Sequence, residues 1–156
     1  MKLTTKGRYA VTAMLDLALH DLGECPVALC DIAARQKISP AYLERLFAGL
    51  RRHNLVGATR GAGGGYRLAR PSADISVAQV MAAVSEDLDA TRCGGERSCH
   101  DGEGCLTHDL WEDLSRHVLD YLEAISLADL CRRSQQHCSI SREAPLRQTT
   151  VRLELR

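Results

Sequence analysis

Three cysteines and one histidine in the middle of the chain have the side-chain types and the spacing of a metal centre. Five residues separate Cys93 from Cys99 and Cys99 from Cys105, and His108 follows the third cysteine after two more residues. Thiolates and imidazoles are ligands that suit iron–sulfur clusters, zinc and copper. The spacing therefore predicts that these four residues form one ligand set.

The width of the spacing favours an iron–sulfur cluster over a single zinc ion. A structural zinc site usually contains close pairs such as Cys-x2-Cys, because each pair forms one tight loop around the ion. Gaps of five residues make wider loops, and three cysteines with one histidine supply the four ligands of a binuclear cluster. Zinc stays an alternative on ligand chemistry alone, and so do free cysteines in a disordered loop. His100, beside Cys99, is an alternative ligand to His108.

The histidine gives this ligand set its particular chemistry. Because Cys105 and His108 are three residues apart, they are predicted to be neighbours on the first turn of a helix. A neutral imidazole in place of a thiolate makes the site less negative and should raise the reduction potential of a cluster. The other four of the seven cysteines show no ligand spacing and are expected to be buried or incidental thiols: Cys25, Cys30, Cys131 and Cys138.

The N-terminal half of the chain is basic and the C-terminal half is acidic, although the formal net charge is +0. Residues 1–70 hold 11 Lys and Arg against 5 Asp and Glu, whereas residues 71–156 hold 9 against 15. This asymmetry suggests that the basic half binds a polyanion. A protein-interaction module with a solvated basic face is the alternative.

The segment from about Ala28 to Arg51 has the pattern of a helix-turn-helix. A short amphipathic helix is followed at once by Ser39 and Pro40, which suit the N-cap and the first position of a second helix at residues 40–53. Two short helices joined by a tight turn define the motif. The glycine-rich residues 61–65, between two short strand-like runs, then predict the tip of a β-hairpin wing.

The second helix of such a motif enters the major groove by its N-terminal turns. Arg can donate two hydrogen bonds to guanine and Glu can accept one from cytosine, so Glu44 and Arg45 are candidate base contacts. Arg51 and Arg52 are better placed for phosphates, and Arg60 at the wing for a narrow minor groove. The predicted DNA contacts are Lys6, Tyr9, Ser39, Ala41, Tyr42, Glu44, Arg45, Arg51, Arg52 and Arg60.

The C-terminal half contains a long apolar stripe with helical spacing. Its members recur every three or four residues: Leu106, Leu110, Leu114, Val118, Leu122 and Ile125. A helix of about 20 residues with such a face would not stand alone in water, so residues 106–125 are predicted to form a dimerisation helix. Ser126 and Asp129 resemble a capping box, with Asp in place of Glu or Gln, that opens a short helix to about residue 133. The polar residues 134–156 are expected to be disordered.

The predicted fold class is mainly α, a winged helix-turn-helix domain with a long C-terminal dimerisation helix. The winged domain spans residues 1–70, a linker and short helix 71–91, the cluster-binding loop 92–108, the dimerisation and terminal helices 106–133, and the tail 134–156. No apolar run reaches the roughly 18 residues that suggest a membrane span. The N-terminus lacks the apolar core of a signal peptide, so a cytoplasmic protein with no membrane partner is expected.

Three segments resemble the Rrf2 family of transcription regulators, over about residues 1–133. They are the N-terminal run MKLTTKGRYAV, the glycine-rich wing at residues 61–66, and residues 90–108 with the candidate ligands. The Cys-x5-Cys-x5-Cys spacing also occurs in the family's nitric-oxide sensors. The added His108, followed by Leu110 and Trp111, is similar to the family's regulators of iron–sulfur cluster biogenesis.

The resemblance implies a homodimer that binds double-stranded DNA and carries one [2Fe–2S] cluster per subunit on Cys93, Cys99, Cys105 and His108. An iron–sulfur assembly scaffold would donate the cluster. The resemblance also implies that the cluster-bound form represses the cluster-assembly genes, while the apo form binds a second class of sites. Glu44 matches the family's acidic residue that discriminates between the two classes. Such a protein is a regulator and not an enzyme.

The sequence departs from the family's usual pattern at several positions. The family usually has Gly at Lys37, Pro at Ala62, and Ser or Gln at Ala41 and Arg45. The last two departures leave the DNA sequence preference open. Two other functions also stay open, a nitric-oxide-sensing repressor of the same family with a [4Fe–4S] cluster, and an adaptor of cluster assembly that does not bind DNA.

Overall fold

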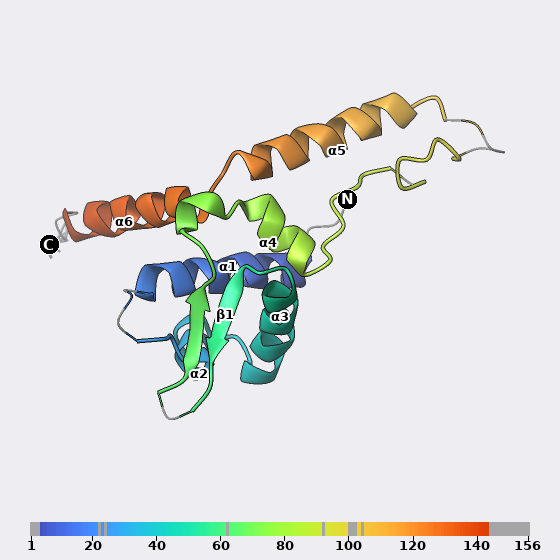
Figure 1. Cartoon of the computed structure of the whole chain (residues 1–156). Coiled ribbons are helices and arrows are strands. Elements are labelled where there is room, and N and C mark those ends of the chain that lie inside the picture. The colour runs from blue at the N-terminus through green and yellow to red at the C-terminus, as the bar shows by residue number, and fades with distance from the viewer. Residues whose placement is uncertain are drawn as a thin grey trace, which may run out of the picture.

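The computed structural model describes residues 4–21, 23, 25–61, 63–91, 93–99, 103 and 105–143, with side chains up to residue 136. In this part of the chain the fold is mainly helical, with one small antiparallel sheet (Figure 1). No helix there is both long and apolar enough to cross a membrane. The elements in chain order are α1 (Thr5–His20), α2 (Leu29–Gln36), α3 (Pro40–Arg52), β1 (Val56–Thr59), β2 (Gly65–Leu68), the 3-10 turn η1 (Ser72–Asp74), α4 (Val77–Ala83), α5 (His108–Glu123) and α6 (Leu127–Glu143).

Helix α1 lies across the centre of the molecule, with α2, α3 and the hairpin on one side and α4 on the other (Figure 1). It begins where the Thr4 hydroxyl accepts a hydrogen bond from the Lys6 amide at 3.2 Å, as an N-cap does. The apolar residues that α1 turns toward the core are fully buried: Ala10, Ala13, Met14 and Leu17. They allow α2, α3 and α4 to pack closely around this helix.

The helix-turn-helix predicted from the sequence is present. Ser39 caps α3 by accepting a hydrogen bond from the Tyr42 amide at 3.2 Å, and Pro40 occupies the first helical turn. Lys37, where the family usually has Gly, takes the left-handed conformation with φ 54° and ψ 40°. That conformation costs a residue with a Cβ about 1–2 kcal/mol. The turn therefore keeps its left-handed geometry without glycine, at this cost in free energy.

The ends of the motif differ from the prediction by one residue. Ala28, the predicted start, is not helical: it has the extended conformation φ −71°, ψ 141° and is the N-cap of α2, which begins at Leu29. The Ala28 side chain makes no capping hydrogen bond, because it has no polar atom, but its carbonyl accepts one from the Ile32 amide at 3.4 Å. At the other end, α3 continues to Arg52, one residue beyond the predicted end of the motif at Arg51.

The β-hairpin wing packs against α3, and the residue Val27 extends its sheet by pairing with the second strand. Strand β1 pairs with β2 in antiparallel register from Val56 opposite Leu68 to Thr59 opposite Gly65. Val27 and Tyr66 exchange two backbone hydrogen bonds of 2.9 and 2.8 Å on the other edge of β2. A Cβ at Gly65 would lie 2.4 Å from the Val27 carbonyl oxygen, so only glycine allows this approach.

A buried carboxylate joins α1 to α2. Asp16 is 2% exposed and accepts hydrogen bonds from the Arg35 guanidinium at 2.6 and 3.1 Å and from the Gln36 amide at 2.6 Å. Burial raises the pKa of this carboxyl, but the hydrogen bonds and charge of its partners outweigh burial, and the pKa of Asp16 lies below its ordinary value. Asp16 therefore stays ionised and fixes the first helix of the DNA-binding motif to α1.

The C-terminal helices are attached to α4 by backbone pairing. The Val77 amide donates to the Ile125 carbonyl and the Leu127 amide donates to the Ile75 carbonyl, both at 2.9 Å. Ser126 and Asp129 cap α6 reciprocally, as the sequence predicts: the Asp129 amide donates to the Ser126 hydroxyl, and the Ser126 amide donates to the Asp129 carboxylate.

Two boundaries in the C-terminal half differ from the prediction. Helix α5 begins at His108, and Leu106 precedes it with its side chain fully exposed, so Leu106 is not part of the helical stripe. Helix α6 extends to Glu143, beyond the predicted end near residue 133. No Gly or Pro interrupts this segment before Pro145. Residues 144–156 of the predicted tail lie outside the described residues.

The Asp16 pair gives a prediction about stability. Arg35→Ala should lower the free energy of unfolding by about 3 kcal/mol at pH 7, because it leaves a buried charge short of its main partner. Urea unfolding followed by circular dichroism measures this difference. Since the folded-state pKa of Asp16 is depressed, the contribution is present above the unfolded-state pKa near 3.9 and is lost as the pH falls through the folded-state value.

The matched control is Arg116→Ala, which removes only exposed ion pairs on α5. Such pairs contribute about 0.5 kcal/mol. Equal unfolding midpoints for Arg35→Ala and Arg116→Ala at pH 7 would contradict the structural role of the buried pair.

Candidate functional site

Three of the four predicted ligands come together between the loop before α5 and the start of that helix. The Cys93 and Cys99 sulfur atoms are 3.2 Å apart, and they lie 3.6 and 3.2 Å from Nδ1 of His108. All three ligand atoms lie within 4.8 Å of one another. The two thiols are half-buried and His108 is 3% exposed. The three side chains could therefore hold one metal centre.

The donor set fits an iron–sulfur cluster. Iron would bind to Nδ1, the ring nitrogen that faces both thiols. Two thiolates with an imidazole are soft and borderline ligands that suit iron–sulfur centres and zinc alike. The other imidazole nitrogen, Nε2, is buried and has no hydrogen-bond partner in the described part of the chain.

Cys105 lies at the edge of this group. Its sulfur is half-buried and 3.8 Å from the Thr107 hydroxyl, outside the set of close ligand atoms. It precedes α5, so the prediction that Cys105 and His108 share the first helical turn is wrong: a turn joins them, in which the His108 amide donates to the Cys105 carbonyl at 2.9 Å. His100, the alternative ligand, lies outside the described residues.

The thiols have different proton affinities. Hydrogen bonds, first from the Cys99 thiol and then from Thr91 and backbone amides, lower the pKa of Cys93 to about 6 in spite of burial. The Cys105 amide lowers the pKa of Cys99, but the neighbouring thiols and burial outweigh it, and the pKa of Cys99 is raised. At neutral pH the group therefore contains a thiolate at Cys93, which is the form that binds iron.

The segment between α4 and the cysteines is tied at both ends. Near the cysteines, the Asp89 carboxylate accepts hydrogen bonds from the Thr91 amide at 2.6 Å and hydroxyl at 2.8 Å, and the Ala90 amide donates to the Ser115 hydroxyl of α5 at 2.8 Å. Near α4, the Glu86 carboxylate accepts hydrogen bonds from the first turn of α1. Residues 85–91 thus connect the candidate metal centre to the start of α1.

The predicted DNA contacts lie on α3, the start of α1 and the wing. Ala41, Glu44 and Arg51 are exposed on α3, and Arg60 is exposed directly after β1. Tyr9 is 38% exposed on α1. Ser39 is also exposed, but its hydroxyl already accepts the capping hydrogen bond of α3. These positions leave polar and charged side chains of the helix-turn-helix and the wing free to contact bases and phosphates.

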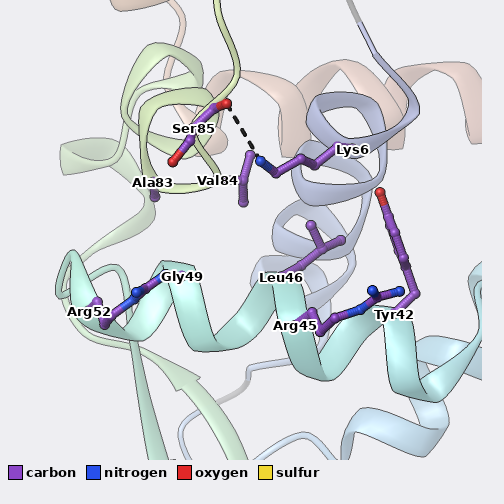
Figure 2. A pocket seen from close by; sticks show the side chains of 9 residues that line it. All are labelled: Lys6, Tyr42, Arg45, Leu46, Gly49, Arg52, Ala83, Val84 and Ser85. Atoms are coloured by element: carbon purple, nitrogen blue, oxygen red, sulfur yellow. Dashed lines mark hydrogen bonds between the residues drawn. The ribbon is translucent and has the colours of Figure 1, made fainter.

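Four of the predicted contacts surround one pocket of about 230 Å³. Figure 2 shows Lys6, Tyr42, Arg45 and Arg52 around its rim. The Arg45 guanidinium lies over the Tyr42 ring, 5.2 Å from the centroid. The Lys6 ammonium lies 3.5 Å from the Ser85 carbonyl, to which it donates a hydrogen bond. Three cations around one pocket suit the phosphates of a nucleic-acid backbone.

No pattern in the sequence predicted the other wall of this pocket. It is formed by the end of α4, at Ala83, Val84 and Ser85. Helix α4 approaches α3 so closely that a Cβ at Gly49 would lie 2.7 Å from the Ala83 carbonyl oxygen. This contact joins residues more than 30 positions apart in the sequence. The feature of the sequence that could have indicated it is Gly49, a glycine inside a predicted helix.

The fold and the two sites define a winged helix-turn-helix DNA-binding protein with a cysteine-rich group next to α5, a helix with several exposed apolar side chains. Residues 3–133 match the Rrf2 family, described as an iron-dependent transcriptional regulator. The chain belongs to this family, which confirms the resemblance seen in the sequence.

Similar proteins carry names of that kind. The chain is 61% identical over 134 residues to the putative HTH-type transcriptional regulator ORF2 of Azotobacter vinelandii, covering 86% of this chain and 81% of the relative. It is 56% identical over 130 residues to the HTH-type transcriptional regulator IscR of Sodalis glossinidius, covering 83% and 78%. Among solved structures, IscR of T. potens superposes with a TM-score of 0.71 at 37% identity, covering 88% and 90% of the two chains.

The lowered pKa of Cys93 gives a prediction about reactivity. In the metal-free protein, alkylation of Cys93 by iodoacetamide should reach half its maximal rate near pH 6, because the thiolate is the nucleophile. Alkylation of Cys131, whose pKa burial raises, should still be increasing at pH 9. Peptide mass spectrometry of both sites between pH 5 and pH 9 measures the two profiles. A Cys93 rate that rises only above pH 8 would contradict the geometry of the group.

Proposed function

We propose that this protein is a transcription regulator that binds DNA according to whether it holds an iron–sulfur cluster. The observation that carries the proposal is the close grouping of Cys93, Cys99 and His108 in a chain with a winged helix-turn-helix. The cluster is a [2Fe–2S] cluster, one per subunit, with Cys105 at the edge of the group as the fourth ligand. A cytoplasmic iron–sulfur assembly scaffold donates it.

Because the cluster binds reversibly, the fraction of protein that holds one follows the supply of iron–sulfur clusters. The chain's own residues convert the presence or absence of the cluster into a change in DNA binding. The cluster-bound protein mainly represses the genes of cluster assembly, so that sufficient supply limits further synthesis. Two features support this function: the family to which the chain belongs and the names of its relatives, which include IscR regulators at 49–56% identity.

The DNA-binding part of the proposal assigns α3 to the major groove. Glu44 and Arg45 read base edges, while the pocket rim at Lys6 and Arg52 holds backbone phosphates. Arg60 reaches the minor groove from the wing. Glu44 discriminates between site classes, because a carboxylate near phosphates is repelled unless a cytosine amino group meets it.

The proposed assembly is a homodimer through α5. In one subunit this helix exposes large apolar side chains, and those on one face are Leu110, Trp111, Leu114 and Tyr121. Their exposed fractions range from 39% to 63%, which a helix exposed to water rarely combines on one face. A second copy of the helix would cover this face and present two recognition helices to half-sites about one DNA turn apart.

Anaerobic purification tests the metal centre. The protein should be coloured and contain about two iron and two sulfide ions per subunit. Cys93→Ala/Cys99→Ala/Cys105→Ala should lose the colour but keep some specific DNA binding, and binding should weaken steeply with salt because phosphate contacts release counterions. Visible absorption, metal and sulfide analysis, and duplex-binding assays measure these properties.

Other results of these experiments would favour other functions. A colourless protein with stoichiometric zinc would overturn the cluster, and four iron ions with a spectrum that nitric oxide abolishes would favour the nitric-oxide sensor. Absence of duplex binding would favour the adaptor. Loss of all specific binding in the triple variant would make the loop a structural element instead of a regulatory one.

A second experiment tests the dimer. Leu110→Glu/Leu114→Glu should convert the protein to monomers and lower its affinity for a two-half-site duplex at least tenfold, because two charges would have to be buried at the α5 interface. Sedimentation velocity and fluorescence anisotropy measure both effects. The control is Asp120→Lys, which changes the charge of α5 well away from that face at about 100° per residue. Dimers that persist in the double variant would place the interface elsewhere.

A further inference from the structure

His108 is buried with one ring nitrogen facing the thiols and the other without a partner. Its Nδ1 faces the sulfur atoms of Cys93 and Cys99, at 3.6 and 3.2 Å. Its Nε2 is buried and accepts or donates no hydrogen bond within the described residues. An imidazole that binds iron through Nδ1 must carry its proton on Nε2, so the binding state buries an N–H donor. That donor needs an acceptor.

The nearest charged acceptor belongs to the next turn of the same helix. An oxygen of the Glu112 carboxylate lies 3.7 Å from Nε2 of His108, four residues along α5. This is slightly beyond hydrogen-bond distance, and the Glu112 side chain is 36% exposed, so a change of side-chain torsion within its space can shorten the contact. Ligating histidines generally donate their second N–H to a carboxylate or a carbonyl.

Glu112 is itself held by two arginines, and one of them belongs to the cysteine loop. Arg97, between Cys93 and Cys99 in the sequence, lies 3.5 Å from a Glu112 oxygen and 2.8 Å from the Asp109 carboxylate. Arg116, one turn further along α5, lies 3.5 Å from the other Glu112 oxygen. One Glu112 oxygen, Oε2, therefore lies near both the histidine ligand and an arginine of the loop that carries both cysteine ligands.

We propose that Glu112 is a positioning residue for the metal centre, which accepts the Nε2 hydrogen of His108 and sets how strongly this histidine donates electrons to iron. The inference rests on the proposed function, in which His108 is a cluster ligand. An anionic acceptor makes the imidazole a more basic ligand and favours the oxidised cluster. Without it the imidazole ring is not held in one orientation and has an unpaired buried donor, so the cluster should be easier to reduce and easier to lose.

The experiment compares wild-type protein with Glu112→Gln, Glu112→Ala and the control Asp113→Asn. Asp113 is the adjacent carboxylate and is paired only with Arg116 among the described ion pairs. Redox titration followed by visible absorption gives the cluster potential, and absorbance loss in the presence of a chelator gives the rate of cluster loss.

The two Glu112 variants should separate charge from hydrogen bonding. Glu112→Gln keeps an acceptor but removes the charge, so it should favour the reduced cluster about tenfold, which is about 59 mV for one electron. Glu112→Ala removes both and should also lose its cluster roughly 10- to 100-fold faster. Gln should largely restore the rate of loss, and Asp113→Asn should change neither property. Glu112→Ala with the potential and loss rate of Asp113→Asn would overturn the inference.

A measurement on the iron-free protein keeps this test independent of the cluster. The nitrogen-15 resonances of the His108 ring report which nitrogen carries the proton. They should show the Nε2–H form in wild-type protein and a mixture of forms in Glu112→Ala. Unchanged resonances would contradict the Glu112 contact even if the protein binds the cluster. A wild-type protein without iron and sulfide would instead overturn the proposed function, and the resonances would still decide the role of Glu112.

Discussion

The carboxylate of Glu86 is the group on which the arrangement of the two sites depends. It is 8% exposed and accepts hydrogen bonds from the Thr4 hydroxyl at 2.6 Å, the Thr4 amide and the Gly7 amide at 3.2 Å. Burial raises its pKa, but these bonds outweigh burial and the pKa of Glu86 is lowered, so the group is ionised at neutral pH. A Cβ at Gly7 would lie 2.7 Å from the Met81 sulfur. The end of α4 is thereby fixed against the start of α1.

This fixed contact connects the cationic pocket and the cysteine group through one short segment. Ser85 forms part of the cationic pocket and accepts a hydrogen bond from Lys6, while Ala90, five residues later, is bound to α5 beside the cysteine group. Under the proposed function, a cluster that orders the cysteine loop would shift the segment that includes Ser85, and with it one wall of the pocket that binds phosphates. By thermodynamic reciprocity, DNA in that pocket would change the affinity for the cluster by the same factor.

The sequence predicted those features that neighbouring residues determine. Ser39 with Pro40, and Ser126 with Asp129, define helix starts through contacts three residues apart. The even cysteine spacing predicted a group that the structure brings together for Cys93, Cys99 and His108, while Cys105 stays at its edge. The Glu86 contact and the α4 wall of the pocket join residues about 30 to 80 positions apart. No local pattern encodes such contacts, because they depend on how whole helices pack.

The attachment of α5 has a mechanical consequence. Directly after its C-terminal end, Ile125 and Leu127 are hydrogen-bonded to Val77 and Ile75, while the cysteine group lies at the opposite end of the helix (Figure 1). A helix of 16 residues is about 24 Å long. It therefore acts as a lever with its pivot on α4, and a rotation of only about 5° would move the far end by about 2 Å. Ser115 lies about halfway along α5 and would move by about 1 Å. That is enough to lengthen the 2.8 Å hydrogen bond from the Ala90 amide beyond hydrogen-bond distance, so small changes in packing at the pivot suffice to make or break it.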